Sequence, residues 1–256
     1  MILTSKNNPL IKETASLKEK KGRKQHGLFL VEGRKMAVEC LNSDFVIDKV
    51  FLAENYSLSL AISEEKIVRV SEDALRFLSD EKTPQGVVCR VKIPQKPLSA
   101  PKGKCLFLDG VADPGNVGAI LRTANAAGYK EIYMTTDCAD PYAPKSVRAS
   151  MSGIFFTDIY RGERSEILNL FKDVPLFVAD MVGENAFQFT SPNKFVLAIG
   201  NEANGLSKQT LERATDKLSI QDSIGIFTVT EAAFLTASER PWASLPTAKQ
   251  YFLGGV

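Results

Sequence analysis

Apolar residues follow helical and strand spacings in turn along the first hundred residues of the chain. Helical spacing occurs over 8–20 and 34–42, and a serine precedes a further helical run at 71–80. Short runs rich in valine and other strand formers occur at 49–53 and 86–91. These patterns predict a small α/β unit of about 90 residues.

Beyond residue 104 the pattern becomes a regular alternation. Short runs of β-branched and aromatic residues predict strands at 105–110, 131–136, 154–160, 176–180 and 195–200. Helical spacing between them predicts helices at 117–128, 143–152 and 163–172. Strands that alternate with helices are typical of a parallel sheet covered by helices, so we predict an α/β fold with a mainly parallel sheet.

The two regions are joined by a segment that favours neither helix nor strand. Residues 92–104, KIPQKPLSAPKGK, contain three prolines, four lysines and one glycine. Such a composition is typical of an extended linker. We therefore expect a first domain over 1–95 and a second over 105–256.

Composition narrows the class of protein. The apolar fraction is 44%, the charged fraction is 24% and the net charge is +2, as in ordinary globular proteins. The four cysteines, Cys40, Cys89, Cys105 and Cys138, form no CxxC pair, which argues against disulfides and a metal site. No apolar run is long enough to span a membrane, and the start does not read as a signal peptide. We expect a cytoplasmic protein without membrane or metal partners.

The positive charge is concentrated at the start of the chain. Residues 1–35 hold nine Lys and Arg against three Glu, an excess of six. Lys20, Lys21 and Lys24 lie in the densest part of this patch, together with Lys18 and Arg23. A cluster of this kind suits a phosphate backbone, although a solvated helix end has the same composition.

The loop after the predicted strand 105–110 has an unusual sequence, DGVADPGNVGAILRTANAAG at 109–128. Pro114 and Gly115 predict a tight turn, and Asn116 can cap the following helix. Arg122 lies one turn beyond Gly118, and its planar guanidinium suits phosphate. The small residues of 117–128 allow another helix to approach closely. A surface arginine on a packed helix explains Arg122 equally well at this point.

A second loop of similar design follows the predicted strand 195–200. Its sequence, GNEANGLS at 200–207, places Gly200 at the strand end and Ser207 before a new helix. Ligands of open α/β sheets bind at the carboxyl ends of the strands. Two polar, glycine-bearing loops at such ends therefore predict one shared cleft.

These loops carry a specific resemblance. LDGVADPGNVGAILRTANAAG and LAIGNEANGLS resemble the first and second motifs of the SpoU-type (TrmH-like) RNA 2′-O-ribose methyltransferases, members of the SPOUT superfamily. RKQHGLFLVEGRKMAVECL and TPQGVVCRV are similar to the amino-terminal substrate-binding domain of that family. DPYAPKSVRASMSGIFF resembles the stretch between the two motifs.

The resemblance implies a complete functional scheme. It implies an L30e-like amino-terminal domain that binds RNA and a carboxyl-terminal α/β-knot domain with a deep trefoil knot. It also implies S-adenosyl-L-methionine as cofactor, ribosomal or transfer RNA as substrate, and a homodimer. The residues it assigns are Arg122, Asn116 and Glu202 for catalysis, Gly200, Ile220 and Phe227 for the cofactor, and Arg148 and Ser150, with Lys20, Lys21 and Lys24, for RNA.

The chain departs from the family pattern in its third motif. Ile226, Phe227 and Thr228 stand where Ser, Leu and Asn are expected, and Thr228 with Glu231 forms an S/T-x-x-E capping box. This leaves two other readings open: an RNA-binding homologue that has lost methyl transfer, and a nucleotide-using α/β enzyme unrelated to RNA. The sequence does not specify which RNA or which nucleotide is modified.

Overall fold

The computed structural model describes residues 2–58, 61–186 and 189–219. The chain folds into two compact units. The first unit comprises Met1–Gln95, Pro114–Arg122 and Ala139–Phe156. The second comprises Lys96–Asp113, Thr123–Cys138 and Thr157–Val256. The chain first passes from one unit to the other between Gln95 and Lys96, inside the predicted linker.

The first unit contains a mixed five-stranded sheet. Its strands, in spatial order, are β1 (Ile2–Leu3), β4 (Ile67–Val70), β3 (Ile47–Ala53), β5 (Val87–Lys92) and β2 (Leu28–Glu32). β1, β4 and β3 run parallel, whereas β5 is antiparallel to both β3 and β2. The strands predicted at 49–53 and 86–91 are therefore confirmed as β3 and β5, and β2 and β4 were not predicted.

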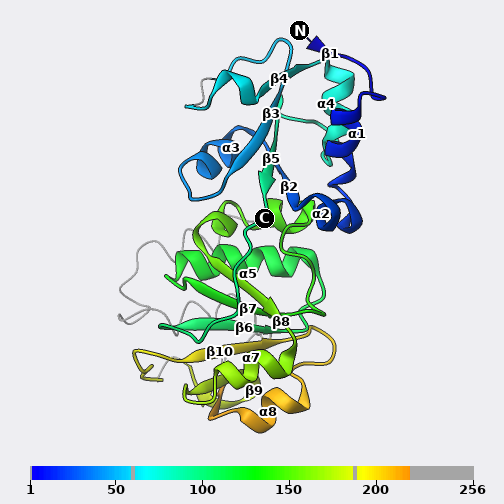
Figure 1. The fold of residues 1–256 in the computed structure, drawn as a ribbon. Coiled ribbons are helices and arrows are strands. Elements are labelled where there is room, and N and C mark those ends of the chain that lie inside the picture. Colours follow the sequence, from blue (N-terminus) through cyan, green and yellow to red (C-terminus); the bar gives the residue numbers. More distant parts are fainter. Residues whose placement is uncertain (1, 59–60, 187–188, 220–256) are drawn as a thin grey trace. The chain divides into compact units, whose positions relative to one another are not determined.

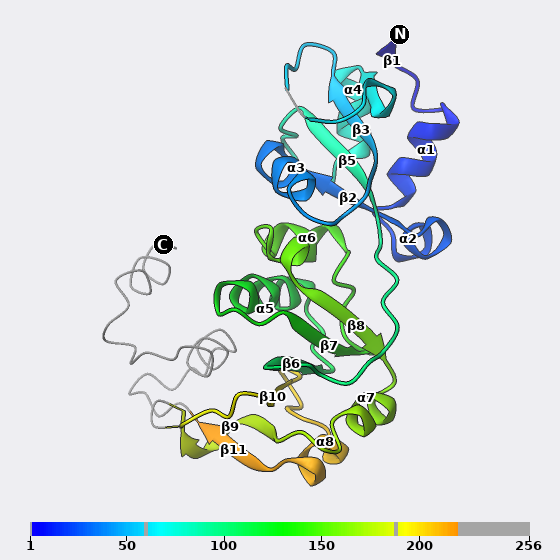
Figure 2. The same ribbon diagram turned by 60° about the vertical axis from the view of Figure 1, so that its left-hand side comes forward.

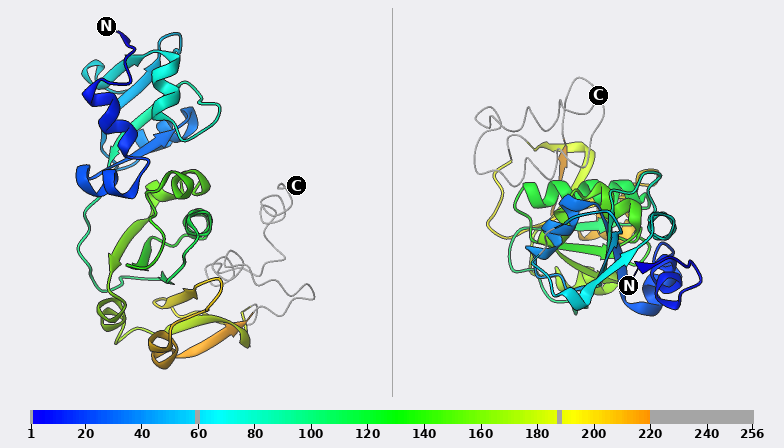
Figure 3. Two further views of the ribbon diagram at one scale, coloured as in Figure 1. Left: turned by 90° about the vertical axis from the view of Figure 1, so that its right-hand side faces the viewer. Right: turned by 90° about the horizontal axis from the view of Figure 1, so that it is seen from above.

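Helices cover both faces of this sheet (Figures 1 and 3). The helices are α1 (Pro9–Ser16), α2 (Lys20–His26), α3 (Arg34–Leu41) and α4 (Glu72–Leu78), with a 3₁₀ turn at Glu64–Lys66. α1 and α4 pack on one face through Ile11, Leu75 and Leu78, which are almost completely buried against Phe51 and Val88. α3 lies on the opposite face.

The predicted helices are largely confirmed, with one difference. α3 matches the expected helix at 34–42, and α4 begins after Ser71, whose side chain accepts a hydrogen bond from the Ala74 amide at 3.3 Å. The helix expected over 8–20 ends at Ser16, and α2 starts separately at Lys20. Gly22 of α2 packs directly on Ser16, where a Cβ would lie 2.1 Å from the carbonyl oxygen. The change of direction between α1 and α2 therefore depends on a residue without a side chain.

The second unit is built on a six-stranded sheet whose strands are all parallel. The spatial order is β11 (Asp216–Ser219), β9 (Leu176–Asn185), β10 (Val196–Gly200), β6 (Cys105–Asp109), β7 (Glu131–Thr135) and β8 (Asp158–Gly162). This confirms the predicted mainly parallel α/β sheet. The predicted strand at 154–160 is displaced, because Gly153–Phe156 forms a 3₁₀ turn and the strand begins at Asp158. β9 is longer than predicted, and β11 was not predicted.

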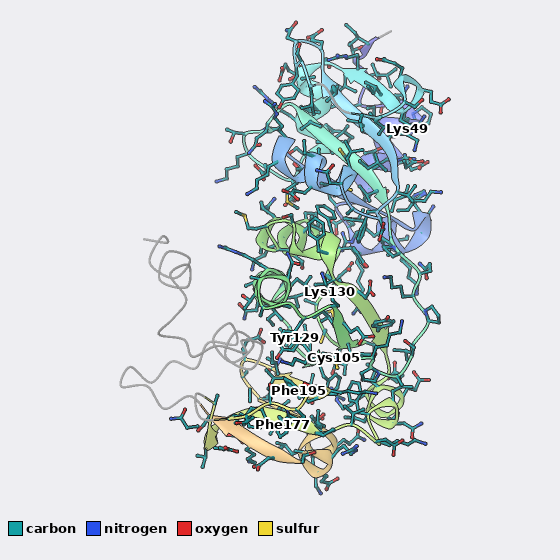
Figure 4. The ribbon with its side chains drawn as sticks, turned by 90° about the vertical axis from the view of Figure 1, so that its left-hand side faces the viewer. Lys49, Cys105, Tyr129, Lys130, Phe177 and Phe195 are labelled. Atoms are coloured by element: carbon teal, nitrogen blue, oxygen red, sulfur yellow. The ribbon has the colours of Figure 1, made fainter. Side chains whose placement is uncertain are left out.

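One face of the parallel sheet is covered by α7 (Arg164–Leu170), with α8 (Lys208–Arg213) beside it (Figure 2). Phe171 follows α7 and packs edge-to-face on Phe107 and on Tyr133. A second aromatic group joins β9 to the segments before β7 and β10, since Phe195 contacts both Tyr129 and Phe177 edge-to-face (Figure 4). Aromatic contacts of this geometry add to the stability gained from burial alone.

Small residues hold α5 (Pro114–Ala126) against α6 (Pro144–Ala149). A Cβ on Gly118 would lie 2.4 Å from the Ser146 carbonyl oxygen and 2.6 Å from the Ala149 Cβ. The close approach that the small residues predict therefore occurs within the chain at Gly118. The helix also starts earlier than expected. Pro114 is its first residue, and Asn116 lies in the first turn and is not the cap.

Candidate active site

The two glycine-bearing loops leave adjacent strands of the parallel sheet. β6 and β10 pair in register, with Gly200 opposite Asp109. From β6 the chain builds the sheet in one direction through β7 and β8, and then crosses to β9 on the other side of β10. β6 and β10 therefore flank the point where the strand order reverses. Ligands of open α/β sheets bind in the crevice outside the strand ends at this point.

Hydrogen bonds connect the two loops. The Ala112 amide donates to Glu202 Oε2 at 3.3 Å, and Asn201 Nδ2 donates to the Gly110 carbonyl at 2.8 Å. The two loops therefore lie together, and the shared cleft expected between them stays a prediction. Glu202, an exposed residue, reaches the first loop two residues before α5 begins.

The second loop is a tight turn with its own internal bonds. Asn201 and Gly205 exchange two backbone hydrogen bonds, of 2.8 and 2.9 Å, and Gly205 has a left-handed φ of +67°. Gly200 sits beneath this turn, where a Cβ would lie 2.4 Å from the Gly205 carbonyl carbon. Any side chain at Gly200 would push the turn away from the strand end. Gly200 is therefore required by the shape of the loop.

A buried carboxylate organises the same end of the sheet. Asp109, the last residue of β6, is 2% exposed. Its Oδ2 accepts hydrogen bonds from the Ser207 amide at 2.9 Å and the Thr210 hydroxyl at 2.7 Å. Its Oδ1 accepts from Arg164 Nε at 2.5 Å. One side chain thus fixes the starts of α7 and α8 relative to β6.

Arg164 is shared between two carboxylates. Its Nε donates to Asp109, and its Nη2 donates to Asp137 Oδ2 at 2.8 Å. Partial burial opposes ionisation of Asp137, but the Thr135 hydroxyl and the Arg164 guanidinium hydrogen-bond its charged form and lower its pKa. Sequence reasoning missed this network. Its available signal was the acidic residue that ends the apolar run CLFLD.

Asn116 and Arg122 both lie on α5, and both are exposed. The backbone at Arg122 is packed tightly, because a Cβ on Gly153 would lie 2.6 Å from the Leu121 carbonyl oxygen and 2.8 Å from the Arg122 Cα. Arg122 is therefore an exposed side chain on a fixed stretch of backbone.

The two residues assigned on α6 have different surroundings. Arg148 is 44% exposed and lies 3.2 Å from Asp80 and 3.9 Å from Glu81. Ser150 follows α6, is completely buried, and donates its hydroxyl hydrogen to the Val147 carbonyl at 2.7 Å. Contact between Ser150 and a substrate would therefore require a rearrangement.

The basic patch separates into exposed and buried members. Lys20, Lys21 and Lys24 are exposed on α2. Arg23 is 4% exposed, and it donates to Asp140 and to the Leu17 and Lys18 carbonyls. The three lysines are thus available to a polyanion, whereas Arg23 has a structural role.

The remaining expectations from the sequence concern the third motif, a metal site, a membrane span and the cysteines. Ile220, Phe227 and the rest of the third motif lie outside the described residues. Within the described ranges no cluster of His, Cys, Asp and Glu is arranged for a metal, and no helix is long and apolar enough to cross a membrane. All four cysteines are buried free thiols, and burial raises the pKa of Cys40 to about 12.

This strand-end region is typical of a ligand-binding α/β fold, since two polar loops meet where the strand order reverses. Comparison with known families identifies the family. Residues 103–226 match the SpoU rRNA Methylase family, and residues 8–89 match the MRM3-like substrate binding domain. The chain belongs to the SpoU-type RNA methyltransferase family.

Individual relatives agree with this assignment. The chain is 26% identical to the Bacillus subtilis 23S rRNA (guanosine(2553)-2'-O)-methyltransferase RlmP over 82% of its own length and 86% of the relative. It is similar to the structure of a putative TrmH-family RNA methyltransferase from Porphyromonas gingivalis, with a TM-score of 0.81 at 28% identity over 90% and 96% of the two chains. A structure described as an RNA 2'-O ribose methyltransferase gives a TM-score of 0.74 at 27% identity over 93% and 96%.

We predict that Asp109→Asn lowers the free energy of unfolding by about 2–4 kcal/mol, because an amide turns an N–H group toward a donor and removes the charge opposite Arg164. Urea denaturation measures the loss. Asp137→Asn makes the same chemical change at a side chain that is 57% exposed, and should cost less than about 1 kcal/mol. Equal losses in the two variants would contradict the central role of Asp109.

Proposed function

We propose that this protein transfers a methyl group from S-adenosyl-L-methionine to a ribose 2′-hydroxyl of structured RNA. The observation that carries the proposal is the pair of joined loops at β6 and β10, which coincide with the region that matches the SpoU rRNA Methylase family. The relative RlmP is named as a 23S rRNA methyltransferase, so ribosomal RNA is the first substrate to test and transfer RNA the second.

The described loop at Gly200 fits a nucleoside cofactor. Its backbone is held in a tight turn by its own hydrogen bonds, and Gly200 allows that turn to pack directly against the strand end. When bound, S-adenosyl-L-methionine supplies an electrophilic methyl on a sulfonium. We assign Gly200, with Ile220 and Phe227 from the third motif, to the cofactor.

The protein must then position and activate a poor nucleophile. We assign Arg122 to the phosphate beside the reacting ribose, where a planar guanidinium makes two parallel hydrogen bonds. We do not assign Arg122 as the proton acceptor, because a guanidinium offers N–H donors and no acceptor. Asn116 supports the substrate from the first turn of α5, and Glu202 orders the first loop through the Ala112 amide.

The other residues extend this scheme to the whole chain. We propose that residues 1–95 form an RNA substrate-binding domain and 105–256 a methyltransferase domain that contains the trefoil knot. Lys20, Lys21 and Lys24 contact RNA phosphates, and Arg148 is a further phosphate contact once it leaves Asp80. We also propose that the protein acts in the cytoplasm as a homodimer.

A second function is favoured by one sequence feature. Ile226 replaces a serine hydroxyl of the family pattern with an aliphatic side chain. A chain that bound RNA but had lost methyl transfer would show this kind of change. The two functions differ in whether the wild-type protein transfers methyl groups at all.

We expect Arg122→Ala to abolish methyl transfer and to change S-adenosyl-L-methionine affinity less than about tenfold, or 1.4 kcal/mol, because the guanidinium is assigned to RNA. Incorporation of labelled methyl groups measures the first effect, and calorimetry the second. Arg76→Ala removes another exposed arginine, on α4, and should retain activity. Loss of cofactor binding in Arg122→Ala would contradict this assignment, and an inactive wild-type protein would favour the second function.

The triple change of Lys20, Lys21 and Lys24 to Ala should flatten the slope of log affinity for RNA against log salt by about 2–3, because each phosphate contact contributes about 0.7–0.9. Binding is measured by filter retention at several salt concentrations. The matched control removes three exposed lysines of the second unit, Lys172, Lys194 and Lys208. If both triple variants change the slope equally, the basic patch has no special role.

A further inference from the structure

The first unit contains a cavity of about 220 Å³, and of the residues that line it only Arg148 has a role assigned above. It lies between the start of α3 and α6. Its apolar lining comes from Leu30, Met36, Val147 and Met151. Pockets for drug-sized ligands are larger, about 300–1,000 Å³. The cavity therefore suits a single flat ring system better than a whole nucleotide.

Polar groups also line this cavity. The Glu32 carboxylate accepts hydrogen bonds from the Ser79 hydroxyl and from the Asp80 amide, at 3.0 Å for the amide, and burial raises its pKa. Gln85 is exposed, and its side-chain amide makes no hydrogen bond to any residue in the described part of the chain. A carboxylate and a free amide together offer acceptors and a donor to the edge of a ring.

Two other lining residues suit the face of an aromatic ring, and Glu81 adds a second carboxylate to the lining. Met36 and Met151 each bring a thioether, and sulfur makes favourable contacts with aromatic rings. Arg148, assigned above to an RNA phosphate, also lines the cavity. Arg34 and Lys35, at the start of α3, are exposed and can reach phosphates outside the cavity.

The rim of the cavity is held in a strained conformation. Met151 and Ser152 have φ angles of +46° and +79°, which residues with a side chain rarely adopt, and Met151 is 52% exposed. The next residue, Gly153, is wedged against the backbone of Leu121 and Arg122. An exposed apolar side chain kept in a costly backbone conformation indicates a functional position. The turn also fixes the cavity rim to the helix that carries Arg122.

We propose that this cavity binds one unpaired guanine base of the RNA substrate. The proposal rests on the proposed function, because it takes the ligand to be part of the RNA. Guanine presents two adjacent N–H donors that match the acceptors of Glu32 and Gln85, and neither adenine nor the pyrimidines offer this pair. Specific RNA recognition reads unstacked bases on such edges. A base held here would fix the RNA relative to the α5–α6 pair.

The direct test is NMR of the full chain with methyl-labelled methionine, titrated with each of the four nucleoside monophosphates. GMP should shift the methyl signals of Met36 and Met151. The methyl signal of Met134, which is completely buried in β7, should not change. GMP should bind at least about tenfold more tightly than AMP, CMP or UMP, because unmatched analogues leave polar groups unpaired. Absence of shifts at both methionines, or equal shifts with all four nucleotides, would overturn the proposal.

Substitutions connect the cavity to RNA. Met36→Trp fills the cavity and should remove the GMP-induced shift of Met151 and weaken RNA binding about tenfold, as for loss of one well-held base. Val38→Trp adds the same side chain at a residue of α3 that is 37% exposed, and should leave both unchanged. If Met36→Trp does not fold, Gln85→Leu, at an exposed position, should reduce the preference for GMP over AMP.

The outcomes separate this proposal from the proposed function. GMP binding with unchanged RNA affinity in Met36→Trp would overturn the assignment of the cavity to RNA. Selective GMP binding and weakened RNA binding in a protein that transfers no methyl group would support the cavity and refute the proposed function. Methyl transfer by a protein in which GMP shifts neither Met36 nor Met151 would support the proposed function and refute the assignment of the cavity.

Discussion

The buried carboxylate of Asp109 is the interaction on which the strand-end region of the parallel sheet depends. It receives donors from α7, from the turn before α8 and from α8 itself. Because a buried charge is costly unless it is fully hydrogen-bonded, these elements cannot move away from β6 independently. The loops at Gly110 and Gly200 begin beside this point, and the bonds of Asn201 and Glu202 join them. Asp109 therefore positions the loops that we assign to the cofactor, although Asp109 itself has no assigned role in the chemistry.

A second constraint acts in the first unit, where backbone approaches backbone without intervening side chains. Gly118 admits the carbonyl of Ser146, and Gly153 admits the backbone of Leu121 and Arg122. These contacts hold the backbone of α5 against the segment that contains Arg148 and Met151. The small residues of the first motif therefore serve internal packing at Gly118. Their use in subunit contacts remains part of the proposal of a homodimer.

Much of the fold could be predicted from local sequence patterns. Long, strongly periodic segments predicted α3, α4, α5 and α7, and runs of apolar residues predicted most strands of the parallel sheet, because burial on both faces requires continuous apolar sequence. The predictions that differ depend on tertiary contacts. The break between α1 and α2 depends on Gly22 packing on Ser16, and the late start of β8 depends on the turn at Gly153. Likewise the partners of Asp109 are 55 to 101 residues away in the chain, and no local pattern reveals them.

The central claim is that the chain modifies ribose in RNA, and it is tested most directly by mapping 2′-O-methyl groups. Ribosomal and transfer RNA are compared from cells with the gene, without it, and with the gene restored. We predict at least one 2′-O-methylated nucleotide that is present with the protein, absent without it and regained on restoration. Identical maps in the three strains would contradict the claim.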